Sequence, residues 1–363
     1  MTYIYSSTTT KSWNYISFNI ILNLFFLFLI LLKFFLIFFI LNIDLNWLRF
    51  LPIILPLILS IAFFTLFERK ILAAMQRRRG PNVTGIFGLL QAFADGFKLI
   101  GKETIIPSSS NYIIFIIAPM LTFTFSIFSW IVIPFDYNIV IIDIDLGLLF
   151  LFAASSLNIY GIVMSGWASN SKYAFLGAFR STAQLISYEV SLGLIIMPVL
   201  LFSGTTNLSG IILAQENLFF FVPLWPSVIL FFISILAETN RLPFDLPEAE
   251  SELVSGFNVE YSSLTFALFF LAEYSSMILM CSLIVILFFG GWLPFIYLLP
   301  FILLPNWFWF SLKVVFFMFL FVWVRGSLPR YRYDQLMTLG WKVILPLSFS
   351  LLIYSVGLIT LFY

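Results

Sequence analysis

The residues of this chain most able to do chemistry are carboxylates in or beside long apolar runs. Glu189 begins one such run, Glu238 ends another, and Glu273 lies thirteen residues after Glu260, which opens a third. At a rise of about 1.5 Å per residue, Glu273 is roughly 20 Å along a helix and close to the middle of a bilayer. Ionisable residues at that depth are costly and usually mark an ion path or a polar partner.

These acids could exchange protons near neutral pH, because burial and neighbouring negative charge both raise the pKa of a carboxyl group. Alternatively, each acid only forms an ion pair that holds helices together, with Arg180 or Arg241 as its partner. The acids outnumber the nearby bases, which favours a path for protons or for charge coupling. The row consists of Glu189, Glu238, Asp245, Glu248, Glu260 and Glu273.

Composition places the chain in a membrane. Of its 363 residues 62% are hydrophobic and 10% are charged, and its mean hydropathy is +1.08. Soluble domains carry about 25% charged residues. The chain has no histidine and one cysteine, Cys281. Iron–sulfur clusters, zinc sites and most haem sites need these residues, so we expect no metal or redox centre held by this chain alone. A net charge of +1 gives no general case for nucleic-acid binding.

Nine apolar segments predict an all-α, polytopic bundle of about nine transmembrane helices. Their continuous runs exclude a β-barrel, whose strands would alternate over about ten residues. Each run can satisfy its own backbone polar groups only as a helix. The segments are Ile16–Leu41, Leu48–Phe67, Tyr112–Ile133, Leu146–Ser165, Leu185–Phe202, Val222–Ala237, Tyr261–Phe289, Trp307–Val324 and Val343–Leu361.

The connections between these segments are basic on one side and acidic on the other. Basic loops stay on the side from which insertion occurs, which is the matrix, or the cytoplasm in a bacterium. On that side Leu90, Phe93 and Phe97 share one helical face, and Asp95, Lys98 and Lys102 share another. This pattern predicts an amphipathic helix at the membrane surface. An ordinary loop helix packed on its neighbours is the alternative.

Five stretches of sequence have a recognisable pattern. They read ERK at 68–70 followed by QRRRGPN at 76–82, GLLQAFADGFKLIGKE at 88–103, SGWASNSKYAFLGAFRSTAQLISYEVSLG at 165–193, LAETNRLPFDLPEAESELVSGFNVEYSS at 236–263, and PRYRYDQLM at 329–337. Together they resemble subunit 1 of respiratory complex I, the family of NADH:ubiquinone oxidoreductase membrane subunits. The resemblance runs from about Leu48 to the end of the chain.

This resemblance implies a subunit that holds no redox centre and forms the membrane part of the ubiquinone channel. FMN, iron–sulfur clusters and the NADH site would belong to partner subunits, and ubiquinone would be the substrate. The quinone would enter between the second and seventh segments, beside the amphipathic helix. Expected partners are the peripheral-arm quinone-site and iron–sulfur subunits, the small and antiporter-like membrane subunits, and membrane lipids. The expected location is the mitochondrial inner membrane.

The resemblance also assigns roles residue by residue. The quinone-channel residues are Glu68, Arg69, Phe257, Phe270 and Arg325. The acids between the quinone cavity and the proton-pumping arm are Glu189, Glu238, Asp245, Glu248, Glu252, Glu260 and Glu273. The accompanying bases are Arg180 and Arg241.

The family core, an eight-helix membrane domain over 48–363, is preceded here by an addition over 1–47. We expect the addition to hold one extra transmembrane helix that braces a neighbouring subunit or lipid. Lys33 in that helix could snorkel or face the bundle.

Three other functions remain open. A stand-alone proton-coupled transporter would also use buried acids, although no inverted repeat with paired broken helices is visible. A membrane subunit of a related hydrogenase would match the loop motifs less closely. A purely structural anchor would not need Glu273 or a row of acids.

Overall fold

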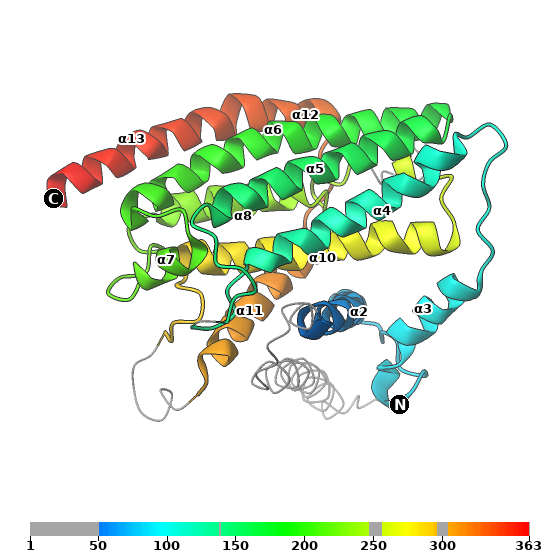
Figure 1. Cartoon of the computed structure of the whole chain (residues 1–363), viewed down its shortest axis with the longest axis horizontal. Coiled ribbons are helices and arrows are strands. Elements are labelled where there is room, and N and C mark those ends of the chain that lie inside the picture. The colour runs from blue at the N-terminus through cyan, green and yellow to red at the C-terminus, as the bar shows by residue number, and fades with distance from the viewer. Residues whose placement is uncertain (1–50, 138, 247–255, 296–303, 363) are drawn as a thin grey trace, which may run out of the picture. The chain divides into compact units, whose positions relative to one another are not determined.

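The computed structural model describes residues 51–137, 139–246, 256–295 and 304–362 (Figure 1). The regular elements of these ranges are all helices, and a single isolated bridge joins Asp136 and Ile139. The chain divides into two compact units, Met1–Asp95 and Gly96–Tyr363. The expected first helix, Ile16–Leu41, lies outside the described residues.

The first unit contains α2 (Leu51–Met75), a short 3₁₀ turn (Ile86–Gly88) and the start of α3 (Gln91–Gly101). A helix was predicted at both α2 and α3, and both helices are confirmed. None of the residues of α3 is buried. Phe93 on its apolar face packs edge-on against Phe63 of α2, with ring centroids 6.1 Å apart.

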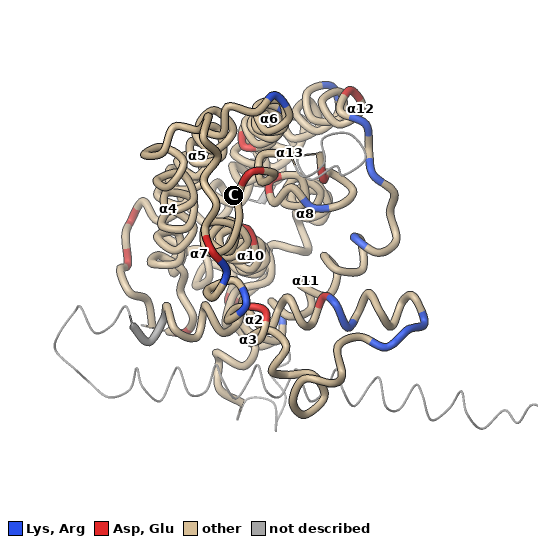
Figure 2. Tube along the Cα trace, turned by 90° about the vertical axis from the view of Figure 1, so that its right-hand side faces the viewer, with Lys and Arg blue, Asp and Glu red and all other residues tan. Residues whose placement is uncertain are grey.

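In the second unit, α4, α5, α6, α10 and α13 run lengthwise beside one another (Figure 1). Charged residues are sparse along the described chain (Figure 2). The helices are α4 (Tyr112–Phe128), α5 (Gly147–Ala168), α6 (Lys172–Ser203), α7 (Leu208–Leu213), α8 (Trp225–Glu238), α10 (Ser263–Phe288), α11 (Asn306–Ser327), α12 (Tyr333–Thr338) and α13 (Leu345–Phe362). A π-type turn over Leu339–Ile344 joins α12 to α13.

Six of the described segments are long and apolar enough to cross a membrane. The prediction of a multi-pass helical bundle is therefore confirmed. The segment expected at Val222–Ala237 is the shorter apolar helix α8, with 14 residues. The six segments are Tyr112–Val132, Gly147–Ala168, Lys172–Ser203, Ser263–Phe288, Asn306–Ser327 and Tyr333–Leu361.

Two helix starts were predicted wrongly. Helix α6 begins at Lys172 instead of Leu185, and the last helical segment begins at Tyr333 instead of Val343. Hydropathy marks the part of a helix that suits hydrocarbon, whereas backbone hydrogen bonding continues into the polar part. As a result, Arg180 lies within a helix and not in a connection, and Glu189 lies in the middle of α6 and not at its start.

Helix α10 is the most enclosed of these segments. In its most apolar stretch 78% of the residues are buried, against 17% for Tyr333–Leu361, so α10 is central and the last helix is peripheral. Nearby, α6 closely approaches the turn Gly256–Asn258, because Gly177 has no side chain. A Cβ added to Gly177 would lie 2.7 Å from the Cα of Gly256.

Two polar side chains bind the backbone at the end of α10. The Lys313 ammonium on α11 is 2% exposed and donates to the carbonyls of Phe289, Gly291 and Leu293 at 2.7, 3.0 and 2.6 Å. The Gln215 amide donates to the carbonyl of Ile286 at 2.9 Å, and its Oε1 accepts from the Gly290 N–H at 2.9 Å. A cation suits this position, because unpaired carbonyls give a helix end partial negative charge.

Candidate functional site

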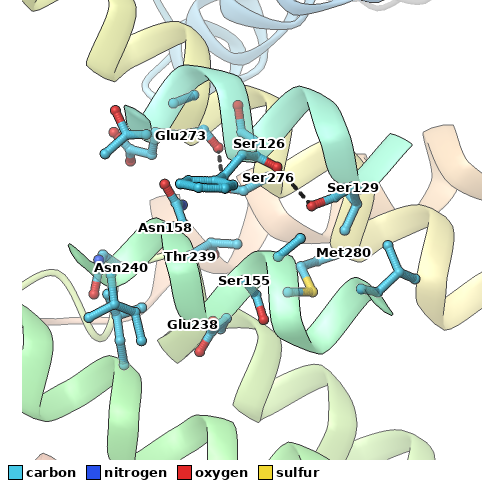
Figure 3. Close-up of a pocket in the computed structure, with 18 of the residues that line it drawn as sticks. Ser126, Ser129, Ser155, Asn158, Glu238, Thr239, Asn240, Glu273, Ser276 and Met280 are labelled. Atoms are coloured by element: carbon cyan, nitrogen blue, oxygen red, sulfur yellow. Dashed lines mark hydrogen bonds between the residues drawn. The ribbon is translucent and has the colours of Figure 1, made fainter. Parts of the chain in front are cut away.

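A cavity of about 100 Å³ lies inside the second unit, with α4, α5, α6, α8 and α10 forming its walls. Since one water molecule needs roughly 10–15 Å³ of such space, the cavity can hold several. Glu238 and Glu273 lie on different walls of it (Figure 3). Its polar lining consists of Thr122, Ser126, Ser129, Ser155, Asn158, Glu238, Thr239, Asn240, Glu273 and Ser276.

The hydroxyl groups of this lining all donate to the backbone of their own helices. The Ser276 Oγ, for example, donates to the carbonyl of Glu273 at 2.7 Å. Because each hydroxyl proton is engaged, only the oxygen lone pairs remain for a molecule inside the cavity. The same arrangement holds for Thr122, Ser126, Ser129, Ser155 and Thr239.

Three further acceptor atoms of the lining are buried and have no hydrogen-bond partner among the described residues. They are Oδ1 of Asn158, Oε2 of Glu238 and Oδ1 of Asn240. Buried polar atoms are almost always paired, often with water. The cavity is thus rich in acceptors, which favours an occupant that supplies hydrogen-bond donors. Water and protonated water both do so.

The structure pairs two of the predicted acids with arginines. The Nε of Arg241 lies 2.9 Å from Oε1 of Glu273, and both side chains are largely buried. The Arg241 guanidinium also lies over the ring of Tyr274, 4.7 Å from its centroid. The Nη2 of Arg330 lies 3.3 Å from Oδ2 of Asp245. Ion pairing, the alternative considered for each acid, therefore describes Glu273 and Asp245.

Glu189 and Glu238 have a different environment. Glu189 lies on α6 and Glu238 is the last residue of α8, and these two helices pack against each other. Glu260 lies in the turn before α10 and does not line the cavity. Glu248 and Glu252 lie outside the described residues. The cavity therefore joins Glu238 and Glu273 out of the predicted row.

In the first unit, the predicted channel residues Glu68 and Arg69 are neighbours on α2. Glu68 is buried, whereas Arg69 is half exposed and pairs with Asp95 at 2.7 Å. Asp95 is itself held by the Gln91 amide at 2.9 Å, and the Thr84 hydroxyl donates to Gln91 at 2.8 Å. The Arg69 guanidinium is thus fixed by a polar network of its own unit.

The other predicted channel residues belong to the second unit. Phe257 lines the acid cavity and packs edge-on against Phe269, with centroids 5.4 Å apart. Phe270 stacks on Tyr274, with centroids 6.4 Å apart, and the Arg241 guanidinium lies over the same tyrosine ring. Arg325 lies in the last turn of α11. Phe257 is therefore placed with the acids.

The predicted base Arg180 lies on α6 with its guanidinium 6.0 Å from the ring centroid of Tyr333, at the start of α12. Arg330, Asn158 and the serines of the cavity were not predicted from the sequence. Asn158 and the serines could have been found because they are polar residues inside apolar segments, where such side chains usually have a polar partner. Arg330 gave none, because it meets Asp245 across 85 positions of sequence.

No group of three or more His, Cys, Asp or Glu residues suited to hold a metal ion occurs in the described parts of the chain. Fold and cavity together define a multi-pass α-helical membrane protein with buried, acid-lined polar space. The family model described as NADH dehydrogenase matches residues 48–356, and the chain belongs to this family.

The relatives are mitochondrial and bacterial chains of similar length. The chain is 59% identical over 314 residues to "NADH-ubiquinone oxidoreductase chain 1" of Chondrus crispus, covering 86% of this chain and 96% of the relative. It is 59% identical over 312 residues to the chain of the same name in Arabidopsis thaliana, with 86% and 96% covered. An NADH-quinone oxidoreductase subunit of Rhodospirillum rubrum is 57% identical over 313 residues, with 86% and 93% covered. The predicted family membership is confirmed.

Proposed function

We infer that this chain is a core membrane subunit of respiratory complex I, the NADH:quinone oxidoreductase. It takes part in quinone reduction and in its coupling to proton translocation as one subunit of a multi-subunit enzyme. Family membership carries the assignment. The observation that connects it to mechanism is the acceptor-rich cavity between Glu238 and Glu273.

The proposed coupling path runs through the acids of the second unit. Glu238 and Glu273 would exchange protons with water in the cavity, because its free lone pairs orient donors toward the walls. Arg241 forms a largely buried ion pair with Glu273. A proton that arrives at Glu273 therefore has to displace this ion pair, which makes the pair a natural switch. The proposed acids are Glu189, Glu238, Asp245, Glu248, Glu252, Glu260 and Glu273, with Arg180 and Arg241 as accompanying bases.

The proposed substrate is ubiquinone, and electrons would reach it from iron–sulfur clusters on partner subunits. The phenylalanines proposed for the channel suit a flat lipophilic ring, and the arginines suit its carbonyl oxygens or a reduced, anionic form. The proposed channel residues are Glu68, Arg69, Phe257, Phe270 and Arg325.

We also propose the finer organisation of the chain. Residues 1–47 would be an addition with one transmembrane helix, and residues 48–363 the membrane domain, for about nine transmembrane helices in all. The chain would lie in the mitochondrial inner membrane, beside the peripheral quinone-site and iron–sulfur subunits and the small and antiporter-like membrane subunits.

The first experiment is purification in mild detergent. Iron–sulfur and antiporter-like proteins should copurify with the chain. In sealed vesicles the purified complex should reduce quinone with NADH and change the pH of the lumen. A chain that purifies alone and still moves protons would be a transporter, which would refute the proposal.

The second experiment tests the acids in the assembled enzyme. Glu189→Gln and Glu238→Gln should impair quinone-linked turnover or proton pumping. Glu216→Gln is the matched control, because Glu216 is exposed and lies outside the proposed path. Coupling that stays unaltered in both test variants would count against the roles of these acids.

A further inference from the structure

Gln184 is a buried amide that connects two ends of one loop. Its side chain lies on α6 and is 0% exposed. The Nε2 donates one hydrogen bond to the carbonyl of Ala237 and another to the carbonyl of Phe244, each at 2.8 Å. Ala237 belongs to the last turn of α8, whereas Phe244 lies beyond the turn that follows. One amide group therefore bridges the end of the helix and the returning chain.

The residues between these two carbonyls carry the charges of the proposed coupling path. Glu238 follows Ala237 directly, Arg241 is three residues further, and Asp245 follows Phe244. Arg241 reaches Glu273 from this loop at 2.9 Å. Displacement of either bonded carbonyl would move these side chains relative to the cavity.

Backbone hydrogen bonds from Asn240 and Arg241 close the end of α8, and the one from Phe244 reaches back only to Arg241, so among the described residues no backbone bond joins Phe244 directly to α8. Asn240 has a φ of +50°, a left-handed conformation that costs energy for a residue other than glycine. Pro243 has no N–H to donate. The ring of Phe244 packs against Tyr188, one turn after Gln184 on α6, with centroids 6.0 Å apart. Helix α6 thus holds the loop by one amide and one ring.

Gln215 shows what a purely structural glutamine looks like in this fold. It also donates to backbone carbonyls, and its Oε1 accepts from the Gly290 N–H, so both ends of the amide are paired. The Oε1 of Gln184 is buried without a partner among the described residues. The orientation of the Gln184 amide follows from its two loop partners, because two carbonyls can be bonded only by the NH₂ group.

We propose that Gln184 is a positioning residue for coupling, which holds the Glu238–Asp245 loop where Glu238 lines the cavity and Arg241 reaches Glu273. This proposal rests on the proposed function, since it concerns how quinone reduction is coupled to proton movement. The hydrogen bonds of Gln184 go to the backbone carbonyls of the loop and not to the charged side chains themselves. Its role is therefore exercised through the position of the loop backbone.

The test compares Gln184→Met with Gln215→Met in the assembled, purified enzyme. Methionine keeps the length and most of the volume of glutamine but donates no hydrogen bond. Rates are expressed per assembled complex. For Gln184→Met we expect the kcat of quinone reduction to fall about tenfold (~1.4 kcal/mol in barrier), with a lower ratio of protons pumped per electron and a KM for quinone within about twofold of the unaltered enzyme. Gln215→Met should change only the amount of assembled enzyme.

Gln184→Glu serves as the second variant where the methionine variant does not assemble, because it keeps the shape while an ionised carboxylate lacks both N–H donors. Equal kcat, KM and proton ratio in the Gln184 and Gln215 variants would overturn the proposal, as would a rise in KM alone. An unaltered enzyme that pumps no protons with NADH and quinone would instead refute the proposed function. The two failures are therefore distinguishable.

Discussion

The Nε of Arg241 lies 2.9 Å from Oε1 of Glu273, so an acid within the membrane-spanning helix α10 is held by a base from a loop. The Arg241 guanidinium is further enclosed by the ring of Tyr274, the residue that follows Glu273. A change in the charge of Glu273 therefore changes the electrostatic attraction that holds Arg241 and its loop. Conversely, movement of this loop changes the electrostatic environment of Glu273.

Removal of one partner of this pair should be worse than removal of both. Arg241→Met leaves the Glu273 carboxylate buried and without this cation, which typically costs about 3–5 kcal/mol when burial is complete and less at the 20% exposure of Glu273. We expect the variant to reduce the assembled enzyme several-fold. The double variant Arg241→Met with Glu273→Gln should recover much of it. Native gel quantification of the complex measures both, and a double variant as poor as the single one would contradict the coupling of these residues.

The polar lining of the cavity should be needed for proton transfer. Asn158→Leu replaces an amide, whose buried oxygen has no partner among the described residues, by an apolar side chain of similar volume. A buried water needs two to four polar partners, and this change removes one of them, so we expect proton pumping to fall by about tenfold, equivalent to ~1.4 kcal/mol. Vesicle acidification assays at matched NADH oxidation give the measurement. Leu157→Met, on the exposed face of the same helix, is the control, and a fall of equal size there would show a general defect of α5.

A methyl group at Gly177 should disturb the turn Gly256–Asn258, because a Cβ there would lie 2.7 Å from the Cα of Gly256. Overpacking of this kind costs about 1–3 kcal/mol. Gly177→Ala should lower the temperature at which the purified complex dissociates. Gly193→Ala on the same helix meets nothing within 4 Å, and alanine favours a helix by up to ~1 kcal/mol. Equal thermal behaviour of the two variants would argue against the close approach.

Lys313 should be required for the integrity of the α10 end. Lys313→Met leaves three buried carbonyls without their shared donor, and each unpaired group costs about 1–3 kcal/mol. The assembled complex should therefore dissociate at a clearly lower temperature than the unaltered one. Lys342→Met, which changes an exposed lysine, should leave the dissociation temperature unaltered. A Lys313 variant of normal stability would mean that the three carbonyls find other donors.

Residue type and spacing predicted much of this molecule. Long apolar runs located the helices of the second unit, and the rarity of acids in such runs singled out Glu238 and Glu273, which line one cavity. The partners of the acids were less accessible. Arg241, which pairs with Glu273, was one of the two bases considered as partners. Arg330 was not considered, because it reaches Asp245 from a segment 85 positions away. Pairings of this kind depend on tertiary packing, which local patterns do not encode.

Neutral polar residues were the other gap. Gln184 and Asn158 lie within apolar helices and carry no charge that would draw attention to them. Their importance arises from what they meet, namely loop carbonyls in one case and a cavity in the other. The extent of α6 was missed for a related reason, because the residues from Lys172 to Gln184 are too polar to stand out by hydropathy although they are helical.

The binding of three carbonyls by Lys313 has a mechanical consequence for α10. The end of this helix at Phe288 is tied to α11 by a buried cation, which could not be withdrawn without leaving a charge unsolvated in the bilayer. The half that carries Glu273 is instead connected to a loop through an ion pair, a contact that protonation can weaken. Helix α10 is therefore fixed at one end by Lys313, whereas its other half is held by an ion pair that can be broken. A displacement of Glu273 would therefore be a small rotation of α10 about its end at Lys313. The end of the helix near Lys313 would stay in place, and the part that carries Glu273 would move.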